Sequence, residues 1–261
     1  MPTADLDGVS VDYTDTGVGP PMVFVPGLAG SKEWFRFQSS GLSDRYRVIS
    51  YDLRRARRGA PYTVDELADD LSRLLAHLRL YGVVVAGHCM GALVAARFAI
   101  AHPERCLALV LLSAAPGFGA MSDHQIMSEL APAGFELDTW VNRLKKRLAP
   151  GTPDAEDDLD PVAYLARHNA GLDKRTLRAR LRLMRECDLS DSVTELQAPT
   201  LIVAGSADHP HILTGSQTLH ELIPDSTLEV LEDTDHYCFY TRHDLVNTTL
   251  DDYVEARLSA I

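Results

Sequence analysis

A cysteine stands between two glycines in the sequence Gly-His-Cys-Met-Gly at residues 87–91. An apolar run at residues 81–86 precedes this turn, and residues 92–98 are predicted to form a helix of small side chains. A strand, a tight Gly-x-nucleophile-x-Gly turn and a helix are typical of a nucleophile elbow, where glycines avoid a Cβ clash. The helix N-terminus and a nearby base would both favour a thiolate. We therefore predict that Cys89 is a nucleophile; the alternative is a small buried cysteine in an ordinary turn.

A cysteine nucleophile needs a base that takes its proton and an acid that orients the base. The apolar run Leu201–Ala204 ends shortly before Asp208, and the run Leu228–Leu231 ends shortly before His236. Because the carboxyl ends of parallel strands share one edge of a sheet, both side chains are expected near Cys89. The alternative roles are a helix N-cap for the aspartate and a surface position for the histidine. We predict that Asp208 orients His236, although three other acids stand closer in the sequence: Glu232, Asp233 and Asp235.

The elements that must position these residues alternate along the chain. Short, mostly apolar runs, which are typical of strands buried on both faces of a parallel sheet, lie between amphipathic helical stretches. The predicted strands are residues 9–13, 22–25, 48–51, 83–86, 107–112, 201–204 and 228–231. This alternation predicts a doubly wound α/β fold with a mostly parallel sheet and reactive loops at the carboxyl ends of its strands.

Two helices have clear sequence signals. Thr63 and Glu66 have the spacing of a capping box, and apolar residues at helical spacing follow as far as Leu78. A last helix is predicted from about His243. Its expected apolar stripe consists of Leu245, Val246, Leu250 and Val254.

One long segment interrupts the alternation. Residues 117–198 contain helical patterns and no convincing strand, and a segment of this length is too long for a loop. We therefore predict a helical lid over residues 117–198, inserted into a core of residues 1–116 and 199–261. Three lid aromatics could line an apolar acyl pocket or pack within the lid: Phe135, Trp140 and Tyr164.

The order nucleophile, acid, base along the chain resembles that of the α/β-hydrolase family. The likeness covers nearly the whole length. Residues 26–30, Pro-Gly-Leu-Ala-Gly, resemble the family's oxyanion loop, where a histidine often stands at the position of Pro26, and residues 51–54 resemble the next strand end. Residues 199–208, with Pro-Thr at the start and Gly-x-x-Asp at the end, resemble the strand that carries the acid.

This resemblance implies a role for each candidate residue. Cys89 would attack a carbonyl carbon, and His236 would take the thiol proton and later activate the acceptor. Asp208 would fix the tautomer of the imidazole. The backbone N–H groups of Leu28 and Met90 would hold the developing oxyanion.

Most members of the family carry serine where this chain carries Cys89. Cysteine occurs in dienelactone hydrolases, polyhydroxyalkanoate synthases and certain thioesterases. A thiol nucleophile forms a thioester, which can pass its acyl group to water, an alcohol, an amine or a second thiol. The resemblance therefore implies a hydrolase that acts on an ester, thioester or lactone of a small organic molecule, without a cofactor. Acyl transfer is one alternative, elimination or cyclisation with His236 as a base is another, and a non-catalytic ligand-binding member is a third.

A second departure from the family follows Asp52. Relatives often read Asp-x-Arg-Gly-x-Gly-x-Ser there, whereas the loop Arg54–Arg58 of this chain holds four arginines in five positions. They could receive a carboxylate or phosphate of the substrate or an acidic carrier protein, or they could form a solvated loop that pairs with nearby acids. In the lid, either the acidic run at residues 154–160 or a ligand could offset a row of cations: Lys174, Arg178, Arg182 and Arg185.

Composition limits the remaining possibilities. The chain has 261 residues, which fits one α/β domain with an insertion, and its net charge of −12 argues against general nucleic-acid binding. No apolar stretch is long enough for a membrane span, and the first residues lack a secretory signal. The four cysteines show no C-x-x-C spacing, so we expect a cytoplasmic location. No metal site is expected, since the close pair His209 and His211 has few further ligands nearby. The oligomeric state leaves no signal in the sequence.

Overall fold

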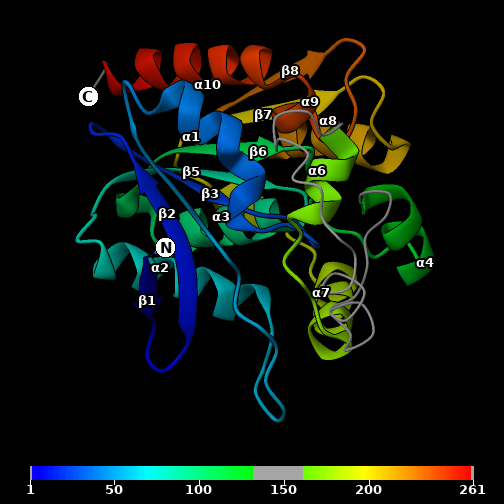
Figure 1. Cartoon of the computed structure of the whole chain (residues 1–261). Coiled ribbons are helices and arrows are strands. Elements are labelled where there is room, and N and C mark those ends of the chain that lie inside the picture. The colour runs from blue at the N-terminus through cyan, green and yellow to red at the C-terminus, as the bar shows by residue number, and fades with distance from the viewer. Residues whose placement is uncertain (1, 132–160, 260–261) are drawn as a thin grey trace.

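The computed structural model describes residues 2–131 and 161–259, and within these ranges eight strands form one sheet (Figure 1). The strands are β1 (Thr3–Asp5), β2 (Ser10–Thr16), β3 (Pro21–Val25), β4 (Arg47–Tyr51), β5 (Val83–His88), β6 (Cys106–Leu112), β7 (Thr200–Gly205) and β8 (Ser226–Leu231). Their order across the sheet is β1-β2-β4-β3-β5-β6-β7-β8. The first two neighbouring pairs are antiparallel and all later pairs are parallel. The predicted doubly wound, mostly parallel α/β sheet is confirmed.

The strands differ in burial according to their place in the sheet. The central strands β5 and β7 are buried at every residue, as their apolar runs predict. The edge strand β8 is partly exposed, and the side chain of Val230 is 38% exposed. Strand β1, which the sequence analysis did not predict, is a three-residue edge strand with one buried residue, Ala4.

Helices cover both faces of the sheet (Figure 1). One face carries α2 (Val64–His77), α3 (Met90–Ala101) and α8 (Pro210–Leu222), and the other carries α1 (Arg36–Leu42) and α10 (His243–Leu258). Leu71, Leu93 and Leu219 join the hydrophobic cluster of the first face, and Leu42 and Leu250 join that of the second. Three short helices lie in the connections: η1 (Lys32–Phe35), η2 (Pro103–Arg105) and α9 (Cys238–Thr241).

The regular elements among the described residues between β6 and β7 are helices and helical turns. They are α4 (Asp123–Gln125), the π-helical turn η3 (Ile126–Leu130), α6 (Pro161–Arg167), α7 (Lys174–Glu186) and η5 (Ser192–Glu195). Figure 1 shows α4, α6 and α7 together on the right of the view, at one end of the sheet. The division into a core of residues 1–116 and 199–261 and a lid of residues 117–198 stays a prediction. Tyr164 packs in the core, its ring stacked on that of Tyr240 at 5.1 Å, whereas Phe135, Trp140 and the acidic run lie outside the described residues.

Two of the predicted helix signals are corrected by the structure. The Thr63 hydroxyl caps α2 by accepting a hydrogen bond from the Glu66 N–H at 3.3 Å. The reciprocal half of the capping box is missing, because the Glu66 carboxylate contacts Nη1 of Arg54 at 3.2 Å instead. Leu245 lies about 100° around α10 from the buried stripe and is 38% exposed. The buried stripe consists of Val246, Leu250 and Val254.

The helices also bear on membrane association. None of the described helices combines the length and the apolar character that a bilayer crossing requires.

Candidate active site

Cys89 lies in the sharp turn between β5 and α3. Its backbone has φ 52° and ψ −114°, a strained conformation for a residue with a side chain. The Cys89 N–H donates to the Leu112 carbonyl at 3.0 Å, and the Cys89 carbonyl accepts from the Ala92 N–H at 3.0 Å. Gly91 is required because a Cβ there would overlap the carbonyl oxygen of Val25 on the neighbouring strand. The strain therefore falls on the cysteine itself, while the glycine allows the close approach of the two segments.

His236 and Asp208 form a buried pair. The Nδ1 atom of His236 lies 3.0 Å from Oδ1 and 3.1 Å from Oδ2 of Asp208. Their loops follow the neighbouring strands β7 and β8, and they come together because Gly205 packs directly against the Thr234 carbonyl, where a Cβ would overlap. The other nitrogen of the ring, Nε2, is buried without a hydrogen bond of normal geometry to a described residue.

The charges of this pair stabilise each other despite burial. Burial lowers the pKa of His236, but the carboxylate of Asp208 and the nearby Cys89 outweigh it and raise the pKa to about 10. Burial likewise raises the pKa of Asp208, yet the net shift is downward because His236, the Ser113 hydroxyl and the His209 N–H stabilise the carboxylate. The influence of Cys89 on the pKa of His236 indicates that the thiol lies beside the imidazole. Asp208 is thus held ionised, with one imidazole nitrogen bound to it and the other free for the thiol.

The other acids near His236 in the sequence have separate roles. The Asp235 carboxylate accepts hydrogen bonds from the Tyr237 N–H at 3.0 Å and from the Thr241 hydroxyl at 3.1 Å. The Asp233 N–H donates to the Ser206 hydroxyl at 2.9 Å. The two Asp235 bonds are typical of local turns, whereas the Asp233 bond joins two loops that lie 27 residues apart in the chain. Among the described residues, Asp208 is therefore the acid that contacts the His236 ring, as predicted.

The two predicted oxyanion donors lie on either side of the elbow. Leu28 is in the loop after β3, and Met90 is the first residue of α3. The loop approaches the nucleophile closely, since a Cβ on Gly27 would stand 3.4 Å from the Cβ of Cys89. Neither the Leu28 N–H nor the Met90 N–H donates to another group in the described part of the chain. Unpaired N–H groups in a buried loop and at a helix N-terminus are suited to an anionic oxygen.

His88 belongs to the site, although the sequence analysis quoted it without giving it a role. Its Nε2 atom lies 3.0 Å from the carbonyl oxygen of His236, and the two ring centroids are 4.8 Å apart. Burial, reinforced by the charge of His236, lowers the pKa of His88 to about 3. The carbonyl can only accept, so neutral His88 donates from Nε2. His88 thus holds the backbone of the base without competing for its charge.

The arginine loop splits into internal and external side chains. Arg54 forms ion pairs with the buried Asp70 and with Glu66. Arg55 lies 4.0 Å from a carboxylate oxygen of Asp173, and Arg57 donates to the Gly8 carbonyl at 2.5 Å. Arg54 is therefore committed to the fold, which leaves the exposed members of the loop to meet a ligand.

The described residues contain no group of three or more His, Cys, Asp or Glu side chains that could hold a metal ion. The His209 ring pairs with Glu129, and Nε2 of His211 lies 2.9 Å from the carbonyl oxygen of Gly117.

The comparisons with known proteins agree with this fold. The family model for the alpha/beta hydrolase fold matches residues 20–242. The 3-oxoadipate enol-lactonase 2 of Acinetobacter baylyi is 26% identical, with 88% of each chain covered. The pimeloyl-[acyl-carrier protein] methyl ester esterase of Aeromonas hydrophila is 27% identical, with 88% of this chain and 94% of the esterase covered. The enol-lactonase structure from Burkholderia xenovorans LB400 has a TM-score of 0.77 at 20% identity, covering 97% of this chain and 100% of that one, and it shows the shared fold.

The chain belongs to the α/β-hydrolase-fold family.

Proposed function

We propose that the protein is a hydrolase that cleaves an ester, thioester or lactone of a small molecule through an acyl-enzyme on Cys89. The observation that carries this proposal is the strained elbow of Cys89 beside the buried Asp208–His236 pair. The names of the two relatives, an enol-lactonase and a methyl ester esterase, support the bond class. A strained backbone at a site of paired, buried titratable groups is typical of a catalytic centre.

The reaction begins from a thiolate–imidazolium pair, in which Nε2 of His236 already holds the thiol proton, and the Cys89 sulfur attacks the carbonyl carbon. The carbonyl π electrons move to oxygen, and the N–H groups of Leu28 and Met90 hold the resulting oxyanion. When the tetrahedral intermediate collapses, the alcohol or thiol leaves with the proton from His236, and a thioester remains on Cys89. Water then loses a proton to Nε2 and attacks the thioester. The second intermediate releases the acid and the Cys89 thiolate, and His236 keeps the proton, so the thiolate–imidazolium pair is restored.

Acyl transfer uses the same intermediate with an alcohol, amine or thiol in place of water. Elimination or cyclisation would need His236 alone, and a binding protein would need none of the three groups. The covalent route uses a thiol, an imidazole and a carboxylate together, so we propose it ahead of either alternative.

Selective alkylation tests the nucleophile. Burial raises the pKa of Cys106 and Cys238 to about 12 and that of Cys187 to about 11. At neutral pH, iodoacetamide should therefore label Cys89 at least ~10-fold faster than these three thiols, which stay protonated. Mass spectrometry of peptides from the wild type and from Cys89→Ala assigns the labelled site. Faster labelling of another cysteine would contradict the assignment.

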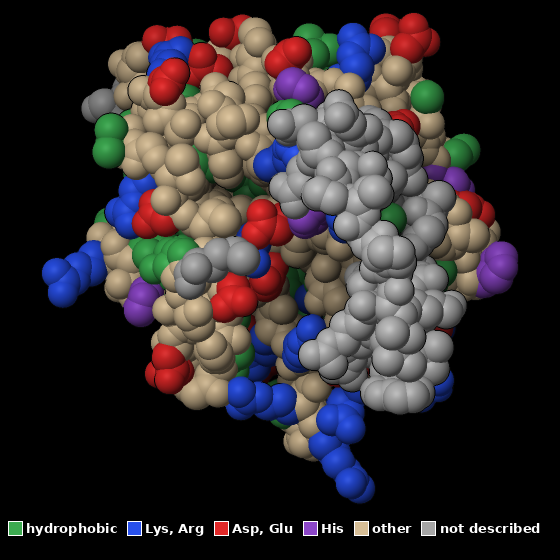
Figure 2. All heavy atoms as spheres, in the orientation of Figure 1, with side chains coloured by type: hydrophobic (Ala, Val, Ile, Leu, Met, Phe, Trp, Pro, Cys, Tyr) green, Lys and Arg blue, Asp and Glu red, His purple; other side chains and the backbone are tan. Residues whose placement is uncertain are grey.

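An acidic carrier protein is the partner that we propose for delivery of the acyl group. A groove of about 990 Å³ lies between the loop before α2 and helix α7, and Asp173 is the one acid among the described residues that line it. The cations that line it are Arg57, Arg58, Lys174, Arg175, Arg178 and Arg182. Figure 2 shows Lys and Arg side chains along the lower edge of the view, where the loop and α7 lie in Figure 1. None of the six forms an ion pair with a described residue, so the groove suits an acidic surface.

The carrier proposal is tested by giving one acyl group in two forms. The double variant Arg178→Ala/Arg182→Ala should lower kcat/KM at least ~10-fold for the acyl group on an acyl-carrier protein. The same variant should leave kcat/KM unchanged for the free pantetheine thioester. The decrease in kcat/KM for the carrier-bound substrate should become smaller as the salt concentration rises, because salt screens the charges of the groove. Equal effects on both substrates, or no effect on either, would reject the carrier.

A further inference from the structure

Arg180 is a buried cation that has no carboxylate partner in the part of the chain that the structure describes. It belongs to α7, and its side chain is 0% exposed. The guanidinium donates from Nε to the Tyr62 hydroxyl at 3.1 Å, from Nη1 to the Leu28 carbonyl at 2.6 Å and from Nη2 to the Leu53 carbonyl at 3.4 Å. All three acceptors are neutral, and no acid among the described residues pairs with it. Burying a charge in this way is unfavourable unless hydrogen bonds replace its hydration, so a gain elsewhere is expected.

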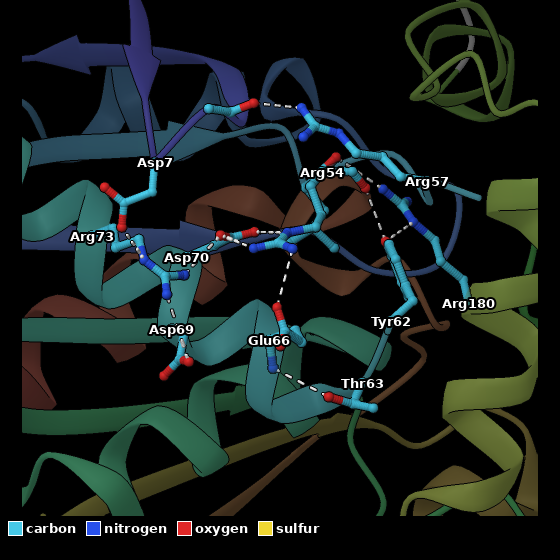
Figure 3. A network of polar contacts seen from close by, with 12 residues as sticks. Asp7, Arg54, Arg57, Tyr62, Thr63, Glu66, Asp69, Asp70, Arg73 and Arg180 are labelled. Carbon is cyan, nitrogen blue, oxygen red and sulfur yellow. Dashed lines mark hydrogen bonds and ion pairs between the residues drawn. The ribbon is translucent and has the colours of Figure 1, made fainter. Parts of the chain in front are cut away.

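The anchors of Arg180 are themselves held in place. Figure 3 shows the guanidinium pointing from α7 toward the hydroxyl of Tyr62. That hydroxyl donates to the Arg54 carbonyl at 3.0 Å, and the Arg54 guanidinium pairs with the buried Asp70 of α2 (Figure 3). The guanidinium is therefore fixed on one side by the arginine loop, while its shortest bond reaches the loop of Leu28.

The loop of Leu28 carries one of the two proposed oxyanion donors. The Gly27 carbonyl accepts from the Gly30 N–H at 3.2 Å, and the Ala29 carbonyl accepts from the Ala170 N–H at 2.8 Å. The Leu28 carbonyl lies between these two and is held by Arg180. The N–H and the carbonyl of one residue flank the same Cα, so a fixed carbonyl restricts the direction of the N–H. The short bond to a cation is the strongest kind of restraint that a neutral carbonyl can receive.

We propose that Arg180 is a positioning residue for the oxyanion hole: by holding the Leu28 carbonyl it restricts the backbone of the loop that presents the Leu28 N–H to the substrate oxygen beside Cys89. The inference rests on the proposed function. The positive charge of Arg180 also favours an oxyanion nearby, because it lies in a buried setting where charges are weakly screened. The competing interpretation is that Arg180 merely fastens α7 to the core.

Two reactions of the same thiol separate these interpretations. Iodoacetamide is attacked at a saturated carbon and forms no oxyanion, whereas p-nitrophenyl acetate passes through a tetrahedral oxyanion. Arg180→Met should lower the rate of Cys89 acylation by p-nitrophenyl acetate about 10- to 100-fold, up to the effect of losing one oxyanion donor. In the same variant, the rate of Cys89 alkylation by iodoacetamide should stay within about threefold of the wild type, because neither Cys89 nor His236 is changed.

The matched control is Ser31→Ala. The Ser31 hydroxyl donates to the His168 carbonyl at 2.6 Å, so it also joins the oxyanion loop region to the insertion without contacting Leu28. We expect both rates of this variant to stay within about threefold of the wild type, as a fastening bond alone would allow.

Milder variants keep the test open if Arg180→Met does not fold. Arg180→Lys keeps the charge but loses the forked contacts, and Tyr62→Phe removes one anchor of the guanidinium. Each should slow acylation more than alkylation. Equal loss of both rates, or unchanged acylation in folded variants, would overturn the inference. A wild type that is alkylated but never acylated at Cys89 would instead refute the proposed function, and this inference with it.

Discussion

At the scale of single residues, the site depends on the electrostatics of two neighbouring histidines. His236 is held beside a carboxylate, which raises its pKa to about 10, whereas His88 is buried and has a pKa lowered to about 3. One imidazole therefore carries charge easily and the other resists it. This difference keeps the proton at the ring that faces the thiol.

Replacing the acid tests the first half of this arrangement. Asp208→Asn should lower kcat by about 10⁴-fold without unfolding the protein, because an amide favours the wrong imidazole tautomer. Asp235→Asn is the matched control, since its carboxylate contacts the Tyr237 N–H rather than the ring, and it should keep most of kcat. Steady-state kinetics with circular dichroism of each variant checks both. A crippling effect of Asp235→Asn alone would assign the acid differently.

Replacing the buried histidine tests the second half through stability. The His88 pKa is depressed in the folded state, so the unfolded state binds the extra proton as pH falls below about 6.5. As the pH is lowered below this value, His88 should lower the free energy of unfolding by about 1.4 kcal/mol per pH unit. His236 contributes little to this slope, because it is largely protonated in both the folded and the unfolded state at these pH values. Urea unfolding of wild type and His88→Gln between about pH 4.5 and 6 measures the slopes. Equal slopes of unfolding free energy against pH for the two proteins would show that the folded state does not disfavour protonation of His88.

At the scale of helices and strands, local signals in the sequence predict most of the core. Apolar runs place β3, β5, β6 and β7, because buried strands and their turns are encoded by neighbouring residues. The chain order of acid and base also anticipates the contact between Asp208 and His236, whereas the role of Cys89 stays a prediction. The reciprocal capping box failed because Glu66 finds Arg54, a partner that only the tertiary fold brings near.

Arg180 shows how a site residue escapes sequence reasoning. It follows Leu177 by three residues and precedes Met184 by four, so it stands on the apolar face of α7. A cation on that face was a signal of burial, but its acceptors lie 118 to 152 residues away in the chain. Such distant contacts depend on the whole fold, and no local pattern specifies them.

The Arg54–Asp70 pair gives a prediction at this scale. Asp70 is 1% exposed, and its loss leaves the largely buried Arg54 without its main partner. Asp70→Ala should lower the free energy of unfolding by about 3–5 kcal/mol. Asp69→Ala, whose side chain is 58% exposed, should change it by less than about 1 kcal/mol. Urea denaturation of the two variants gives both values, and similar small losses would show that the pair is dispensable.

At the scale of the whole molecule, charge is distributed unevenly. The chain as a whole carries a net charge of −12, yet six cations gather in the groove beside α7. Helix α7 contributes to the groove through Arg178 and Arg182 and to the oxyanion loop through Arg180. One helix thus joins the proposed carrier surface to the proposed catalytic centre.

The central claim is that Cys89 forms an acyl-enzyme, and intact-protein mass spectrometry after rapid mixing with p-nitrophenyl acetate tests it most directly. We predict a mass increase of one acetyl group that maps to Cys89 and decays as acetate is released. In Cys89→Ala, both this mass increase and turnover should be absent. Cys89→Ser should keep the fold and show slower acylation, because the hydroxyl must lose its proton at each attack. Near-normal turnover by Cys89→Ala, together with no turnover by His236→Ala, would contradict covalent catalysis and leave His236 acting alone as a base.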